Sequence, residues 1–224
     1  MTFETQHIFD IGTGIYTIPD IATILKLSPS KVRRWMKEYW NEKFAKNGDE
    51  KFSEGSGKEQ VTNFYTLIEF YTFYQLRLHG VSSNKINKAH EVLSDLYKTK
   101  YPFAKSNILT DTKNVFFNHE NGELIEADKG LQITIKQVLE PFCKSIDFDK
   151  NALATKFYPL GRNHDIVIDP QRQFGQPVIG DTNILTETVY DLHRAGESSK
   201  VIANIFELTS KQVKDAIDFH LKAA

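Results

Sequence analysis

The stretch YTIPDIATILKLSPSKVRRWMKEYW, residues Tyr16–Trp40, has the pattern of two short helices joined by a tight turn. Thr17 is placed to cap the first helix with Asp20 as its capping-box partner, and Ser28 is placed to cap the second. Apolar residues recur at helical spacing in both segments, and basic residues fill the outer positions of the second. This layout predicts a helix-turn-helix whose second helix enters the DNA major groove. An ordinary helical hairpin with a solvated charged face is the alternative.

The candidate DNA contacts lie at the two caps and along the second helix. They are Thr17, Ser28, Ser30, Lys31, Arg33, Arg34 and Lys37. In the usual docking, residues near the start of this helix, namely Ser30 and Lys31, face the groove together with Arg34. Trp35 shares the helical face of Val32, so we expect it in the core rather than in the groove.

Composition excludes several classes of protein. The 224 residues are 40% hydrophobic and 25% charged, as in a globular chain, and the formal net charge of −1 means that any DNA affinity must come from a local basic patch. A single cysteine, Cys143, excludes an internal disulfide. No apolar run approaches the ~20 residues of a membrane span, and the N-terminus has no signal-peptide pattern, so we expect a cytoplasmic protein without membrane contact.

The segments that follow the first helix pair change character twice. Residues 41–60 are polar and glycine-rich, which suits either a short hairpin acting as a wing or a plain flexible loop. Val61–His79 is apolar almost all round, which predicts a buried helix and a candidate dimer interface. A further helix begins at Ser82 or Ser83, with His90 on its apolar face as a core histidine.

The middle of the chain has mixed signals and no assignable chemistry. Short β-prone pieces occupy Ile108–Ile125, a helix is predicted over Leu131–Phe142, and strands are predicted at Ala152–Tyr158 and Ile166–Ile168. From Thr186 to Leu221 the pattern is helical again, with breaks after Ala195 and at Glu207-Leu208.

The first and last helix pairs align without gaps at an offset of 181 residues. Ile21–Ser28 lies over Ile202–Thr209, which predicts a second helix-turn-helix near the end of the chain. The charges differ, because Lys26–Lys37 holds five basic and no acidic residues, whereas Glu207–Asp218 holds two basic and three acidic ones. Non-specific DNA affinity requires Lys and Arg, so the first unit is predicted to read DNA and the second to meet a protein. The candidate partner contacts are Lys211, Lys214, Asp215 and Asp218.

No pattern argues for catalysis or for a cofactor. The seven histidines show no metal-ligand spacing, and the triplet Asn163-His164-Asp165 is expected to be a turn. Nucleophile-elbow, Walker and dinucleotide-binding motifs are missing, and Cys143 at an apolar helix end is expected to be a buried thiol. We therefore expect a non-enzymatic protein without a metal or another cofactor.

Two regions resemble known families. Tyr16–Trp40 together with the segments that follow it is similar to a MerR-like winged helix-turn-helix, and Ile166–Ile217 resembles the small three-helix domain of VapB-type antitoxins. The matching marks outside the first helix pair are Val61–Phe64, Leu78–Ser82, Tyr101–Ala104, Tyr158–Gly161, Asp169-Pro170, Gly175-x-Pro177-Val178-Ile179 and Gly196–Ser198. One departure is Asp181-Thr182-Asn183, where the family usually has Gly-Thr-Arg.

The resemblance implies an antitoxin of a type II toxin–antitoxin module. Such a protein neutralises a toxin, typically a PIN-domain ribonuclease, and represses its own operon by binding the operator. We expect a homodimer, because one such module buries little DNA surface. The expected fold is mainly α with small β elements (α+β). It would comprise a winged helix-turn-helix domain over residues 1–106, a mixed α/β section over 107–160 and a small helical domain over 161–224. A ligand-responsive MerR-like regulator and a protein-interaction adaptor remain the alternatives.

Overall fold

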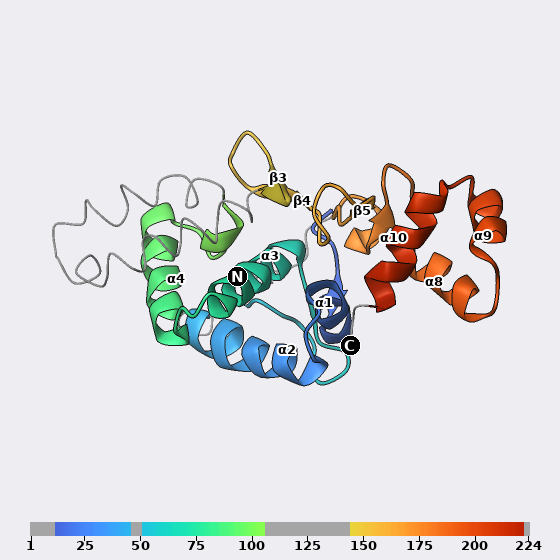
Figure 1. Ribbon diagram of the computed structural model, residues 1–224. Coiled ribbons are helices and arrows are strands. Elements are labelled where there is room, and N and C mark those ends of the chain that lie inside the picture. Colours follow the sequence, from blue (N-terminus) through green and yellow to red (C-terminus); the bar gives the residue numbers. More distant parts are fainter. Residues whose placement is uncertain (1–11, 46–50, 106–143, 222–224) are drawn as a thin grey trace, which may run out of the picture. The chain divides into compact units, whose positions relative to one another are not determined.

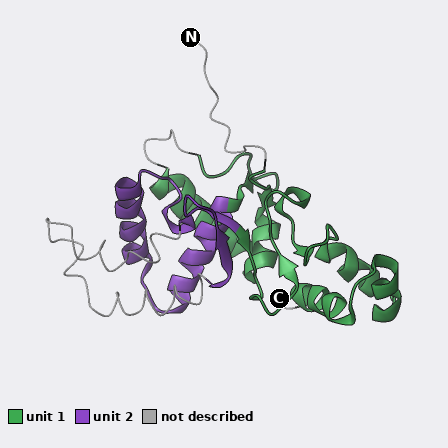
Figure 2. Ribbon diagram, turned by 90° about the horizontal axis from the view of Figure 1, so that it is seen from above, with its two compact units in different colours: residues 1–64, 156–224 green, residues 65–155 purple. Residues whose placement is uncertain are grey.

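The computed structural model describes residues 12–45, 51–105 and 144–221. These residues form two compact units, the first from residues 1–64 and 156–224 and the second from residues 65–155 (Figure 2). Both the first and the third of the expected sequence segments therefore contribute to the first unit. The predicted domain boundaries at 106 and 160 stay a prediction, and the elements predicted over Ile108–Ile125 and Leu131–Phe142 lie outside the described residues, as does Cys143.

The first unit begins with the predicted helix pair. Strand β1 (Tyr16–Thr17) leads into α1 (Ile18–Leu25), and α2 (Pro29–Trp35) continues as a π-helix over Met36–Phe44. The predicted caps are confirmed, since Thr17 and Asp20 form a reciprocal capping box and the Ser28 hydroxyl accepts a hydrogen bond from the Lys31 amide. The π-helix was not predicted.

The segment behind α2 returns to the start of the helix pair. Strand β2 (Val61–Thr62) pairs antiparallel with β1, Tyr16 lying opposite Thr62, and Val61 also forms a β-bridge with Glu54. Residues 54–61 therefore make a short hairpin that contains Gly55 and Gly57, and its role as a wing stays a prediction.

The C-terminal part of the first unit is a three-helix module on a two-stranded sheet. Strands β5 (Ile166–Val167) and β6 (Val178–Ile179) pair antiparallel, and a 3₁₀ turn over Gln173–Gly175 lies between them. Helix α10 (Ser210–Leu221) packs against both α8 (Thr186–Arg194) and α9 (Ser199–Phe206), as Figure 1 shows. The predicted helices and their breaks are confirmed here.

The internal repeat is reproduced in backbone detail. Helices α1 and α9 are both eight residues long and begin 181 residues apart, each after a capping hydroxyl. Each ends at a residue in the left-handed region, Lys26 with φ 56° and Glu207 with φ 54°. In both turns the next amide, that of Leu27 or Leu208, donates to the carbonyl of the shared alanine. The chain therefore contains two helix-turn-helix units of the same local construction.

The second unit is built on α3 (Phe64–Leu78) and α4 (Ser83–Tyr97), followed by a 3₁₀ turn over Pro102–Ala104. Strand β3 (Ile146–Phe148) pairs with β4 (Ala154–Phe157), where the boundary between the units falls. Helix α3 is buried along most of its length, as predicted, and His90 lies in the core. Most apolar side chains of α3 are already covered within the chain, so the idea that this helix forms a dimer interface loses its main support.

Within the described ranges no helix is long and apolar enough to cross a membrane.

Candidate nucleic-acid interface

Helix α2 presents a buried side and a basic side. Val32 and Trp35 are buried, which confirms the prediction that Trp35 belongs to the core. Arg33, Arg34 and Lys37 are exposed, and Ser30 is exposed at the first turn. Lys31 is half-buried, with its Nζ 5.1 Å from the centroid of the Trp35 ring. Three guanidinium or ammonium groups thus project from one helix into solvent, which is the arrangement that phosphate and guanine contacts require.

The two capping residues among the candidates have hydroxyls that already serve the helix ends. The Thr17 hydroxyl donates to Asp20 Oδ2 at 2.8 Å and accepts from the Asp20 amide at 3.2 Å. The Ser28 Oγ lies 3.2 Å from the Ser30 Oγ and 3.3 Å from the Lys31 amide nitrogen. Contact of Thr17 and Ser28 with DNA stays a prediction.

Lys26, which contributed to the charge contrast between the two units, is turned toward the C-terminal module. Its Nζ donates to the carbonyl oxygen of Phe219 and lies 4.0 Å from the centroid of the Phe219 ring. Of the five basic residues counted from the sequence over Lys26–Lys37, Lys26 is therefore bonded elsewhere in the fold, and Arg33, Arg34 and Lys37 are the exposed ones. The sequence could not show this, because Phe219 lies 193 residues away.

In the second helix-turn-helix, the position on α10 that corresponds to Arg34 is buried. Asp215, at the position of Arg34, is 5% exposed, and its two oxygens accept from the His164 Nδ1 at 2.9 Å, the Asp165 amide at 3.0 Å and the Lys211 Nζ at 2.8 Å. Burial favours the neutral carboxyl, but the hydrogen bonds from Lys211 and His164 outweigh it and lower the pKa of Asp215. This placement does not fit the expected direct contact of Asp215 with a partner.

The neighbouring candidates are placed differently. Lys211 also bonds Asp165 Oδ2 at 3.0 Å, whereas Lys214 is exposed and Asp218 is half-buried. The turn at Asn163–Asp165 thus packs on α10 through Asp215 and Lys211, which gives this triplet a structural role. Among the described residues, no group of three histidine, cysteine, aspartate or glutamate side chains could hold a metal ion.

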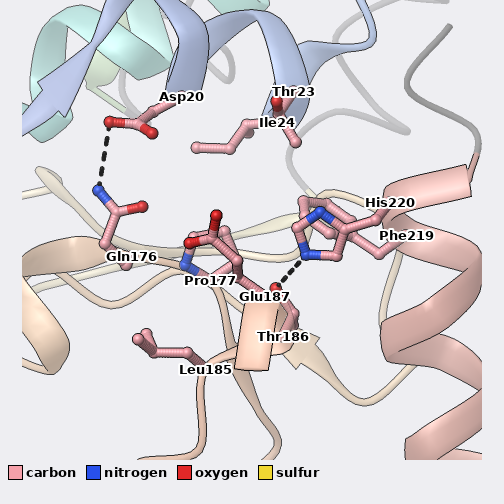
Figure 3. Close-up of a pocket in the computed structure, with 10 residues that line it drawn as sticks. All are labelled: Asp20, Thr23, Ile24, Gln176, Pro177, Leu185, Thr186, Glu187, Phe219 and His220. Atoms are coloured by element: carbon pink, nitrogen blue, oxygen red, sulfur yellow. Dashed lines mark hydrogen bonds between the residues drawn. The ribbon is translucent and has the colours of Figure 1, made fainter. Parts of the chain in front are cut away.

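A shallow pocket lies within the first unit where α1 meets the C-terminal module (Figure 3). Its lining combines carboxylates, an amide, hydroxyls and apolar groups: Asp20, Thr23, Ile24, Gln176, Pro177, Leu185, Thr186, Glu187, Phe219 and His220. Gln176 Nε2 bridges the Ile15 carbonyl oxygen at 3.1 Å and Asp20 Oδ2 at 3.4 Å. Gln176 was not singled out from the sequence, although it occupies the open position of the Gly175-x-Pro177 mark.

His220 lines one side of this pocket, and its pKa is well below the ordinary value for histidine. Burial and the positive charge of Lys26 lower its pKa to about 4, against the weaker opposing effect of Asp191. Its Nε2 lies 3.0 Å from the Thr186 Oγ1, and its ring stacks on Tyr190 at 4.8 Å between centroids. The neutral imidazole is therefore the form that fits this site.

The low pKa of His220 predicts a loss of stability on acidification. Between the ordinary pKa of 6.5 and about 4, the unfolded chain binds a proton at His220 that the folded chain does not. The contribution of His220 is thus fully present above pH 6.5 and is lost as the pH falls toward 4. We expect the urea midpoint to fall less between pH 7 and pH 5 in His220→Gln than in the wild type, since glutamine can still bond Thr186. Equal shifts in both proteins would show that His220 does not control stability in this pH range.

Comparison with known proteins points in one direction. Residues 166–220, which span the C-terminal module, match the family described as a protein of unknown function (DUF433). The chain is 28% identical to "Putative antitoxin VapB45" of Mycobacterium tuberculosis, over 73% of each protein. Its fold is similar to the crystal structure of Rv2018 from Mycobacterium tuberculosis, with a TM-score of 0.71 and 19% identity, covering 94% of this chain and 99% of the other. The expected likeness to VapB-type antitoxins is therefore supported by a relative in sequence, and the fold by a solved structure.

Proposed function

We propose that the protein is the antitoxin of a type II toxin–antitoxin module and that it represses its own operon by binding the operator through α2. The observation that carries the antitoxin role is the likeness to VapB45 over 73% of each chain. In this role the protein is a non-enzymatic regulator that neutralises its toxin by binding, and the toxin is a PIN-domain ribonuclease.

The DNA-binding part of the proposal is supported by the geometry of the first helix-turn-helix. The exposed basic side chains of α2 follow a capped N-terminus, which is the end of a recognition helix that contacts bases. The hairpin over residues 54–61 follows in the chain order of a MerR-like wing, and exposed Lys58 lies near its tip. A homodimer is part of the proposal, because one such module covers only a small DNA surface.

Toxin binding is assigned to the exposed side of α9. The position of Ile205 corresponds to that of Ile24 in the first unit, yet Ile205 is 58% exposed whereas Ile24 is only 3% exposed. Val201, one helical turn earlier, is 41% exposed. The same face of the repeated helix is thus covered in one copy and open in the other, and an open apolar face beside the DNA-reading unit supports a protein partner.

Coexpression with the product of the adjacent reading frame tests this proposal. We expect the two chains to copurify and the antitoxin chain to restore growth that the toxin arrests. Ile205→Asp should weaken the complex by roughly tenfold or more, because a charge replaces a buried apolar contact. Asn204→Asp is the matched control, since it adds the same charge at the neighbouring exposed position. If the wild-type chain neither copurifies nor restores growth, the antitoxin role is wrong; if Ile205→Asp behaves like the control, only the surface is wrong.

A further inference from the structure

We infer that the C-terminal module is a brace for the DNA-reading helix-turn-helix, and that Gln176 and Lys26 are positioning residues for DNA binding. The brace is defined here as the contacts that hold the two ends of α1 to residues 174–177 and to Phe219. The inference rests on the proposed DNA binding by α2, but the contacts themselves lie within the first unit. It assigns to the DUF433-like module a role other than toxin binding.

The N-terminal end of α1 is held by the loop between β5 and β6. The Ile15 amide donates to the Phe174 carbonyl oxygen at 2.8 Å, and the Gln176 side chain bonds the Ile15 carbonyl oxygen and Asp20 Oδ2. Asp20 is also the capping-box partner of Thr17, so Gln176 touches the cap of α1 itself. Gly175 packs so closely on the Tyr16 hydroxyl that a side chain would not fit there, and Tyr16 is fully buried.

The backbone of this loop is shaped for the contact. Gln173, Phe174 and Gly175 all have positive φ, of 46°, 55° and 85°. Non-glycine residues rarely adopt this region, and two in succession persist only where the surroundings impose them. The conformation places the Phe174 carbonyl oxygen against the Ile15 amide and the side-chain carboxamide of Gln176 against Asp20. It leaves the Phe174 side chain 75% exposed. The strained backbone of this loop is therefore what positions its hydrogen-bonding groups against the start of α1.

The C-terminal end of α1 is held by α10. Lys26 is the left-handed residue that ends α1, and its ammonium group bonds the Phe219 carbonyl and lies over the Phe219 ring. A carbonyl near the end of a helix is an acceptor without an intrahelical donor, so a cation is favoured there. Between the two ends, Ile24 is buried and lines the pocket beside Pro177, Leu185 and Phe219 (Figure 3).

The brace contact at Lys26 lies two residues before the cap of the recognition helix α2. Only Leu27 separates Lys26 from Ser28, the cap of α2, and the Leu27 amide is fixed on the Ala22 carbonyl of α1. A shift of the α1 end thus moves the first turn of α2, where groove contacts are made. The second helix-turn-helix is suited to this structural role, because Asp215, at the position of Arg34, is buried, and Asp215 and Lys211 on α10 bond the turn at His164-Asp165.

The two left-handed caps provide a matched test. Lys26→Gly and Glu207→Gly make the same backbone change at corresponding positions, and glycine relieves the left-handed conformation in both. Only Lys26→Gly also removes a brace contact. We expect Lys26→Gly and Gln176→Ala each to bind DNA from upstream of the gene roughly tenfold more weakly than the wild type, by titration in mobility-shift assays. Glu207→Gly should bind like the wild type.

The salt dependence distinguishes positioning from a phosphate contact. A lost phosphate contact reduces the slope of log affinity against log salt by about 1, whereas a displaced helix weakens binding without that signature. We expect the uncharged Gln176→Ala to lose affinity with the slope unchanged. Lys26→Arg should restore binding, because a guanidinium can still bond the Phe219 carbonyl and stack on its ring.

Hydrogen exchange tests the brace even without DNA. The amides of Lys31–Lys37 should exchange faster in Lys26→Gly and Gln176→Ala than in Glu207→Gly, since only the first two loosen α1. Wild-type protein that fails to shift any DNA, with this exchange difference present, would reject the proposed repressor role and keep the brace. Equal exchange in all variants, or loss of DNA binding in Glu207→Gly to the same degree as in Lys26→Gly, would overturn the brace.

Discussion

Replacement of both Arg33 and Arg34 by glutamine is expected to lower the affinity for DNA by at least about thirtyfold, because each guanidinium contact contributes roughly 1–3 kcal/mol. Both side chains are exposed on α2, opposite buried Val32 and Trp35, so their removal leaves the core intact. The substitution should therefore leave the thermal unfolding midpoint nearly unchanged. Mobility-shift titration with DNA from upstream of the gene measures the loss.

The single variants separate base contacts from phosphate contacts. If Arg34 grips a guanine, Arg34→Ala should weaken binding to the operator far more than to unrelated DNA. If it touches a phosphate, binding to both should weaken evenly, and the salt slope should fall by about 1. Arg34 lies one helical turn after Ser30 and so shares its side of α2, which favours the guanine contact in the usual docking.

The repeat supplies the control for this prediction. Lys214 on α10 corresponds to Arg33 on α2 and is likewise exposed. Lys214→Gln should bind DNA like the wild type, because α10 carries Asp215 and Asp218 where the first unit carries Arg34 and Lys37. Equal losses in Lys214→Gln and Arg33→Gln would mean that general charge, rather than α2, controls the affinity. If the double arginine variant binds DNA with wild-type affinity, α2 is not the DNA-binding helix.

Local rules predicted the helix pairs well. The caps at Thr17 and Ser28 and the break at Glu207-Leu208 follow from residue types within four positions of one another. Such signals act through backbone groups that are close in sequence, so they can be recognised without a tertiary structure. The likeness between the two pairs could be seen for the same reason, and the charge contrast between them is the basis for proposing α2 as the DNA-binding helix.

Long-range partners were the features that the sequence could not reveal. Asp215 reads as a surface acid of an amphipathic helix, yet residues 50 and 51 positions earlier hold its carboxylate inside the fold. In the sequence Lys26 looks like part of a basic patch, yet its ammonium group donates a hydrogen bond to the carbonyl oxygen of Phe219. The π-helix over Met36–Phe44 has no local signature in the caps or in the turn residues that guided the interpretation. For Asp215 and Lys26 the deciding contact depends on which distant segments pack together.

Glu69 is another residue whose role only the structure shows, and its removal is expected to destabilise the second unit by about 3–5 kcal/mol. Its carboxylate is fully buried on α3, with Oε2 2.8 Å from the His90 Nε2 of α4 and Oε1 accepting from the Phe103 amide at 2.6 Å. Burial raises the pKa of Glu69, and the nearby His90 and the amides of Phe103 and Ala104 oppose that rise. Glu69→Ala would leave both His90 and the Phe103 amide without this partner.

Graded variants show which of these contacts matters. Glu69→Gln keeps an acceptor for the Phe103 amide but replaces the carboxyl group that faces the His90 Nε2, so its loss of stability should lie between that of Glu69→Ala and the wild type. Glu91→Ala removes an exposed glutamate one residue beyond His90 and should change stability by no more than about 0.5 kcal/mol. Urea unfolding followed by far-UV circular dichroism measures all three. A loss below about 1 kcal/mol for Glu69→Ala would mean that water reaches the site and replaces the carboxylate, which contradicts a buried pair that joins α3 to α4.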